Sequence, residues 1–318
     1  MNAKTDCSCA LPIERARGLT PEIFYQRYLA GQGKPVILTK AITSWPALTR
    51  WSFDLFKARY GSDNVVPRIF TGTRRLKPMT LGDYLDYLDA PEVMPSGLWI
   101  DDKTMFPCPP PSASSPPLYL AWNVFGTHPE LLEDIELSPK FVEDWLPLLP
   151  AHLRKTLDDA TVYFAAGLMI GPKNSQTMLH YDFLDTHAYL AQIIGRKRCV
   201  LYSPEDSAAL YNGNVNPDVP DFEKHPLFRQ ATPYECILDP GELLFIPYRW
   251  WHHVVGLEKS ITVNYNFFNR VNFGGYLKHL LRDLPSVVEG LGKLPDARAA
   301  LGIEWTCRGF DFPDSGKV

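Results

Sequence analysis

The 318-residue chain lacks several features that would place it in other classes of protein. It has no continuous apolar run of about 18–20 residues, the length that a membrane-spanning helix needs. Its first residues, MNAKTDCSCALPIERARG, contain no apolar core, so we expect no export signal and a cytoplasmic location. Lysine and arginine together number 32 against 36 acidic residues, and no long basic run is present. This balance argues against an extended nucleic-acid surface.

Cysteine is also scarce. In a chain of this length without an export signal, six cysteines predict free thiols rather than a disulfide framework. The neighbouring Cys7 and Cys9 are too few for a zinc site without further ligands. The full set is Cys7, Cys9, Cys108, Cys199, Cys236 and Cys307. Apolar residues, by contrast, make up 45% of the chain, which is enough for a sizeable folded core.

Helix and strand signals alternate in the N-terminal third. We expect residues 1–18 to form a flexible tail. Helices should begin after the capping residues Thr20, Ser52 and Thr80, with another after Ser138. Short strands are expected between these helices, at 35–39, 65–70 and 118–122. The sequence therefore predicts an N-terminal α/β elaboration ahead of the main domain.

From residue 161 the pattern becomes one of short strands separated by turn residues, as in Asp239-Pro240-Gly241. About eight strands in this arrangement predict a mainly β fold, either a sandwich or a jelly roll. The expected strands are 162–169, 177–182, 187–194, 198–202, 235–238, 243–246, 252–257 and 260–268. We place the main domain at 19–270, its jelly-roll core at about 161–268, and a C-terminal helical extension at 271–318.

Two segments look irregular. Residues 102–117 are dense in proline, which forbids helix and central strand, and they could be a domain linker or a loop over the mouth of a site. The strand expected immediately afterwards favours the loop. Residues 212–233 are polar and proline-rich, and we expect them to cross one end of the barrel.

The candidate metal ligands are His180, Asp182 and His252. Residues two apart on a strand point to the same face, so His180 and Asp182 would project side by side. A second histidine arrives from LDPGELLFIPYRWWHHVV, which reads as turn, strand, corner and strand. Two histidines and a carboxylate form the facial triad of non-haem Fe(II) oxygenases. The alternatives are a buried His–Asp hydrogen-bonded pair, and His253 in place of His252.

Several stretches together carry a resemblance to a known family: TMLHYD, QIIGRKRCVLYSPED, LDPGELLFIPYRWWHHV and ITVNYNF. From about Thr20 onward the chain resembles the JmjC, or cupin-like, family of Fe(II)- and 2-oxoglutarate-dependent oxygenases, and in particular its asparaginyl hydroxylase branch. The resemblance implies a double-stranded β-helix inside a jelly roll. It also implies that iron binds His180, Asp182 and His252, because the family's ligand directly follows the Trp-Trp pair.

The same resemblance implies a 2-oxoglutarate site, because the buried far carboxylate of this cosubstrate needs a cation and hydroxyl donors. Lys197 matches the family's cation, Thr177 and Tyr119 its hydroxyl positions, and Asn264 a nearby polar position. Without the family, Lys197 would be part of an ordinary exposed basic turn. One departure concerns an asparagine four residues before Gln192. Ala188 stands there in this chain, and either His187 substitutes for the asparagine or no residue does.

Three classes of function remain open. The resemblance favours hydroxylation of a protein or peptide side chain, with conversion of 2-oxoglutarate to succinate and CO₂. The same chemistry on a small molecule or nucleoside is the second class. A binding module or a non-redox cupin holding zinc or manganese is the third, although such a protein would have no use for a 2-oxoglutarate anchor at Lys197. The mechanism requires no catalytic side chain beyond the metal ligands.

The stretch 274–301 carries two amphipathic repeats, GGYLKHLLRDL and SVVEGLGKL. Their apolar stripes must be buried, either against the chain's own barrel or against a second copy. The family likeness favours a homodimer through these helices, with Leu280 and Leu284 in the contact.

Overall fold

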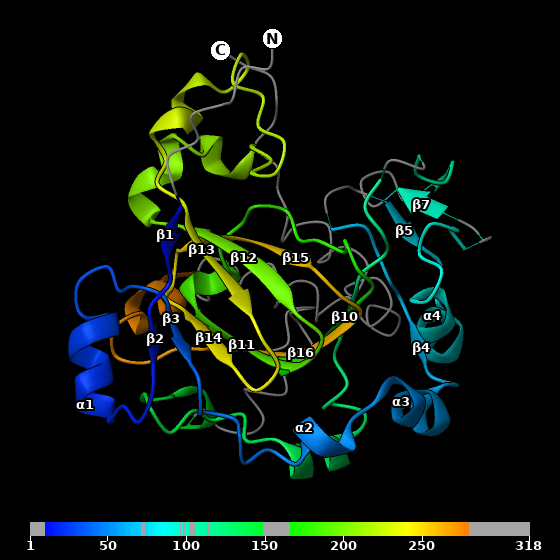
Figure 1. The fold of residues 1–318 in the computed structure, drawn as a ribbon, viewed down its shortest axis with the longest axis horizontal. Coiled ribbons are helices and arrows are strands. Elements are labelled where there is room, and N and C mark those ends of the chain that lie inside the picture. Colours follow the sequence, from blue (N-terminus) through cyan, green and yellow to red (C-terminus); the bar gives the residue numbers. More distant parts are fainter. Residues whose placement is uncertain are drawn as a thin grey trace, which may run out of the picture.

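Two facing β-sheets form the centre of the computed structural model (Figure 1), which describes residues 10–70, 74–95, 97, 99–101, 106–112, 115–148 and 166–279. The larger sheet has the strand order β2-β3-β14-β11-β16-β10-β9. In that order the strands span Arg15–Ala16, Val36–Leu38, Leu243–Ile246, His187–Ile194, Ser260–Phe267, Ala166–Gly171 and Leu120–Trp122. The smaller sheet, β1-β13-β12-β15, spans Leu11–Pro12, Tyr234–Leu238, Lys197–Tyr202 and Trp251–Gly256.

Strand pairing is antiparallel throughout both sheets except at the two N-terminal additions, β1 on β13 and β2 on β3. Alternate residues of each strand face the space between the sheets, as the pleat requires. The apolar part of this interior is a cluster that includes Ala188, Leu190, Cys199, Leu201, Leu244, Ile246 and Val254. The arrangement confirms the predicted jelly roll, in which one end of the interior is left for polar side chains.

The N-terminal α/β elaboration covers the outer face of the larger sheet, where Phe24 and Tyr189 belong to a single buried cluster. Its helices are α1 (Pro21–Phe24, continuing as a π-helical turn Tyr25–Leu29), α2 (Ala47–Arg50), α3 (Phe53–Tyr60) and α4 (Leu81–Tyr87). Two small sheets join β4 (Asn64–Val65) to β6 (Met79–Thr80), and β5 (Arg74–Leu76) to β7 (Trp99–Asp101) and β8 (Pro107–Cys108).

Three of the predicted helix caps are confirmed. The side-chain oxygens of Thr20, Ser52 and Thr80 accept hydrogen bonds from the backbone N–H three residues later, at 3.3, 3.0 and 3.1 Å. The expected helix after Ser138 is wrong, since no α-helix begins in the described residues 139–148. The Ser138 hydroxyl donates to Asp144 instead (3.0 Å), and only a 3₁₀ turn, Leu146–Leu148, follows.

The expected tail 1–18 differs from the structure in its described part, because β1 and β2 add residues 11–16 to the two sheets. The proline-rich segment is not wholly irregular, since β8 pairs with β7. Residues 1–9 and 280–318 lie outside the described part of the chain, and with them most of the stretch expected to form a dimer.

The connection between β12 and β13 contains three short 3₁₀ turns and forms the yellow-green lobe at the top of Figure 1. They are η5 (Pro204–Ala208), η6 (Tyr211–Gly213) and η7 (Pro226–Gln230), while η2 (Pro129–Asp134) and η4 (Phe183–Asp185) lie elsewhere. No helix in the described ranges has the length and apolar content to cross a membrane.

Candidate metal centre

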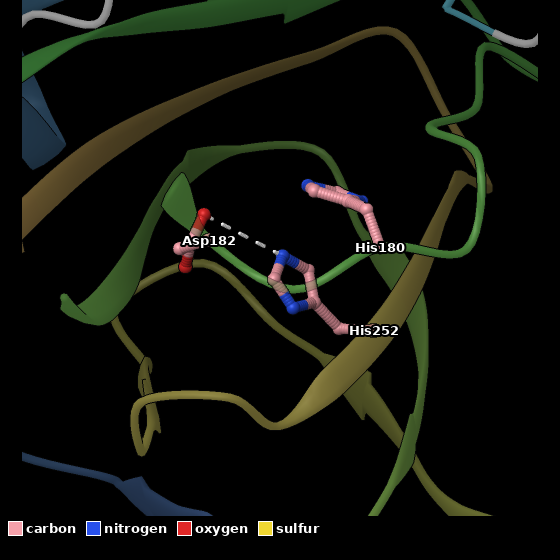
Figure 2. A group of neighbouring side chains, drawn as sticks. All are labelled: His180, Asp182 and His252. Carbon is pink, nitrogen blue, oxygen red and sulfur yellow. Dashed lines mark ion pairs between the residues drawn. The ribbon is translucent and has the colours of Figure 1, made fainter. Parts of the chain in front are cut away.

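The three predicted metal ligands meet at one point between the sheets. Figure 2 shows His252 on its strand, with His180 and Asp182 arriving from the facing segment. The two imidazole centroids are 4.2 Å apart, and His252 Nε2 lies 3.9 Å from Asp182 Oδ1. One donor atom from each residue lies within 4.8 Å of the other two. The structure thus brings together the donor set that the sequence singled out.

The backbone achieves this placement differently from the prediction. Residues 177–182 were expected to be a strand, but they form only one isolated bridge to β15, between His180 and His252. At that bridge each amide donates to the other residue's carbonyl, at 3.1 and 2.7 Å. Asp182 then leads into the turn η4, in which Leu184 and Asp185 have positive φ values of 60° and 53°. The irregular backbone turns Asp182 towards His252 after a single bridge.

The tautomers of both histidines suit metal binding. His180 Nδ1 lies 2.8 Å from the carbonyl oxygen of Met178, and His252 Nδ1 lies 3.1 Å from that of Trp250. Because a carbonyl only accepts, each Nδ1 carries the proton and each Nε2 keeps its lone pair for a metal. Burial and the neighbouring His252 lower the pKa of His180 to about 3, so this imidazole is neutral at ordinary pH. Two imidazoles, each with Nε2 turned away from its backbone hydrogen bond, and one carboxylate form a donor set that fits Fe(II).

A polar row on β16 supports Asp182. Burial raises the pKa of Asp182, while His252 and a hydrogen bond from Asn266 act in the opposite direction. Asn266 also donates to the Thr186 hydroxyl (3.1 Å) and accepts from the Asn264 amide (2.8 Å). Asn264 was predicted as a site residue, whereas Asn266 and Thr186 were missed. The spacing Asn264–Asn266 was the available signal, since residues two apart share a strand face.

Further along the barrel, Lys197 is 2% exposed and donates from Nζ to the Tyr119 hydroxyl at 2.7 Å. Burial lowers the pKa of Lys197 to about 7. Burial likewise raises the pKa of Tyr119. Among the described residues, no carboxylate lies within ion-pairing distance of Lys197. Its neighbours Arg196 and Arg198 instead pair with carboxylates outside the barrel interior.

Two further hydroxyl side chains, those of Ser175 and Thr177, lie on the segment that runs beside β15. Thr177 Oγ1 accepts a hydrogen bond from the Val254 amide (3.1 Å), which fixes the Thr177 side chain. Ser175, which the sequence reasoning missed, is 1% exposed and its hydroxyl has no partner within the described structure. A side chain at Gly171 would collide with Ser175 Oγ and approach Tyr119 Cδ2 to 2.5 Å, so glycine allows these two residues to pack together.

Two open questions from the sequence have geometric answers. His253 points away from the barrel interior. Its Nε2 lies 2.9 Å from Asp218 Oδ2, and it does not belong to the group of candidate ligands. His187 lies on the outer face of β11, between the rings of Phe245 and Phe267 at 5.5 and 5.4 Å. It therefore does not replace the expected asparagine. Ala188 faces the interior, and its strand partner Asn266 places an amide there instead.

Comparisons with known proteins agree with this site. A family model described as a cupin-like domain matches residues 21–273. The chain is 31% identical over 282 residues to lysine-specific demethylase JMJ21 of Arabidopsis thaliana, covering 82% of this chain and 26% of that protein. It is 32% identical over 271 residues to lysine-specific demethylase 8 of Xenopus tropicalis, covering 82% and 53%. It is 28% identical over 266 residues to tRNA wybutosine-synthesizing protein 5 of Gallus gallus, covering 80% and 76%.

The chain thus spans about a quarter and about half of the two demethylases. None of these three relatives is named as an asparaginyl hydroxylase, so the comparisons support the broader family and not the expected branch of it. The family match covers most of the chain and includes all three candidate ligands: the protein belongs to the cupin-like, JmjC-like domain family.

Proposed function

We propose that the protein is an Fe(II)- and 2-oxoglutarate-dependent dioxygenase that hydroxylates a side chain of a protein or peptide. One observation carries the proposal: a three-residue donor set and a buried lysine without an acidic partner among the described residues share one barrel interior. Burial without a nearby negative charge disfavours the ammonium form of Lys197, and the far carboxylate of 2-oxoglutarate would supply that charge.

The roles of the chain's own residues follow from their positions. His180, Asp182 and His252 would hold iron, which supplies the oxidising chemistry when bound and leaves positions open for ligands. Lys197 would bind the far carboxylate, with the hydroxyls of Tyr119, Thr177 and Ser175 nearby. Asn264 and Asn266 would keep the Asp182 carboxylate turned towards the two histidines. Apart from these residues, the proposal requires no acid or base.

The names of two relatives, both lysine-specific demethylases, favour a protein substrate. The wybutosine-synthesizing relative favours a modified nucleoside of tRNA as the second candidate, and this chain spans the larger share of that protein.

Incubation with Fe(II), 2-oxoglutarate and candidate substrates would test the proposal. Three substrate pools would be compared: methylated and unmethylated peptides, tRNA, and small metabolites. We expect succinate to form and one pool to gain a single oxygen atom or lose a methyl group by mass spectrometry. A His252→Ala variant is the control. If the wild type binds metal but neither binds nor consumes 2-oxoglutarate, the protein is a non-redox cupin and the proposal is wrong.

A further inference from the structure

Asp185 lies three residues after the candidate ligand Asp182 and is almost completely buried, with its side chain 3% exposed. It follows Leu184, and both residues have left-handed backbone conformations, with φ values of 60° and 53°. Residues other than glycine adopt the left-handed region only when surrounding contacts compensate for the strain. The contacts of the Asp185 carboxylate are therefore what hold this turn in place.

The first contact is to the segment that carries the other histidine. Arg249 lies three residues before His252 and also has a left-handed φ, of 63°. Its Nε donates to Asp185 Oδ1 at 2.9 Å and its second guanidinium nitrogen donates to Oδ2 at 2.6 Å. Such a two-point pair fixes orientation as well as distance. It joins the turn behind Asp182 to the turn ahead of His252.

The second set of contacts comes from the helix at residues 273–279, orange in Figure 1, and from the residue just before it. The Asn272 side chain donates to the Asp185 carbonyl at 2.8 Å, and His279 Nε2 lies 3.5 Å from Asp185 Oδ2. Gly275 lies directly against the carboxylate, since a Cβ atom there would be 2.5 Å from Oδ2. A Cβ at this position would therefore push the carboxylate away from its contact with Arg249.

We propose that Asp185 is a positioning residue for the metal centre, and that docking of helix 273–279 against it sets the spacing between Asp182 and His252. The carboxylate ties the two ligand-bearing turns to each other and to the helix. Disturbing the helix at Gly275 therefore changes metal binding, although the helix contributes no ligand. The inference rests on the metal centre of the proposed function and is independent of the substrate.

Two adjacent glycines provide a matched pair of variants. Gly274→Ala and Gly275→Ala make the same change in the same helix, but a Cβ at Gly274 meets nothing within 4 Å. We would measure the dissociation constant for Mn(II) by electron paramagnetic resonance and record the visible spectrum of the Co(II) form. Gly275→Ala should weaken Mn(II) binding by about 10- to 100-fold, the usual effect of losing a residue that orients a metal ligand. Gly274→Ala should match the wild type.

Asp185→Asn and Arg249→Lys extend the test, because both weaken the two-point pair without creating a cavity. Both should weaken Mn(II) binding and shift the Co(II) spectrum, measured on folded protein. In an Asp185→Ala background, Gly275→Ala should add no further loss, since both changes act through one carboxylate. Arg249 is half exposed, so its variant should fold even where Asp185→Asn does not.

The possible failures are distinguishable. If the wild type binds no divalent metal, the proposed function fails. If the wild type binds metal and Gly275→Ala or Arg249→Lys binds it equally well, the positioning role of Asp185 is overturned. Equal losses in Gly274→Ala and Gly275→Ala would overturn it as well. A loss of thermal stability in the variants with unchanged metal affinity would show a purely structural contact and would also contradict the proposal.

Discussion

The two ends of the barrel interior place their polar groups in different ways. At the Lys197 end, β12 is paired on both sides, and Lys197 is an ordinary inward-facing residue of a regular ladder. At the metal end the regular pairing stops, and a single bridge, a 3₁₀ turn and left-handed residues carry His180 and Asp182. The single charged group of Lys197 needs only an inward-facing position on a strand, shielded from water. Three donors that converge on one point need a regular strand for His252 and a second segment whose backbone leaves the regular pleat.

The largest expected effect tests the metal end alone. His180→Ala or Asp182→Ala removes one of the three donors that the described residues bring together, so metal binding and turnover should fall to background. The fold should persist, because these residues contribute little apolar packing, and the free energy of unfolding should change by about 1 kcal/mol or less. Metal titration, product formation and urea unfolding would check this. Wild-type turnover in either variant would contradict the assignment.

At the other end, Lys197→Met should raise the dissociation constant for 2-oxoglutarate while leaving metal affinity nearly unchanged. Loss of the cation that would face the buried carboxylate should weaken binding by about 2–5 kcal/mol. Calorimetric titration of the Mn(II) form would measure both affinities. Arg196→Ala and Arg198→Ala are the controls, because their side chains pair with Glu258 and Glu235 instead. A larger effect from either control would show that the wrong member of the basic turn had been chosen.

The contrast between the ends explains what the sequence could predict. Strand periodicity located β11, β14 and β16 almost to the residue, because these strands are regular and buried on both faces. The sequence also singled out the three residues that converge at the candidate metal site. The strand expected at 177–182 failed because apolar–polar alternation does not record where a partner strand ends. The Asp185–Arg249 pair was invisible, since its members are 64 residues apart and neither lies in a recognisable motif.

Ionisation of Lys197 should make both the stability of the protein and its affinity for 2-oxoglutarate depend on pH. The pKa of Lys197 is lowered to about 7, below its ordinary value of 10.5, so the unfolded chain binds more protons between these values. The ligand-free protein should therefore gain stability as pH rises through that window. Binding of 2-oxoglutarate needs the ammonium form, so its dissociation constant should be flat below a pH of about 7 and rise by up to ~tenfold per unit above it.

A Lys197→Arg variant is the control for this prediction, because a guanidinium keeps its charge throughout the range and should flatten the dependence. The binding of 2-oxoglutarate to the Mn(II) form would be measured from about pH 6 to about pH 9. An unperturbed lysine, with a pKa near ~10.4, would stay charged throughout this range. If the dissociation constant depends equally steeply on pH in the wild type and in Lys197→Arg, the titrating group is not Lys197.

The smallest expected effect concerns the crossing segment 212–233, which packs beside both histidine-bearing segments. Its residues Val215 and Phe228 share a buried cluster with Leu179 and Trp251, the chain neighbours of His180 and His252. Val219 in this segment is 76% exposed, and we predict that the segment borders the mouth of the site. Because loops on a rigid scaffold select substrates, Val219→Asp should raise KM for the substrate by about three- to tenfold, equivalent to ~1 kcal/mol.

The same variant should leave kcat and the substrate-independent decarboxylation of 2-oxoglutarate unchanged, because Lys197 and the three donors are untouched. Val93→Asp is the matched control, since Val93 is 66% exposed but lies in the N-terminal elaboration. Steady-state kinetics on the substrate found by the mass-spectrometric screen would decide the matter. An equal change in KM for both variants would show a general effect of surface charge, and the crossing segment would then have no part in substrate selection at the metal end.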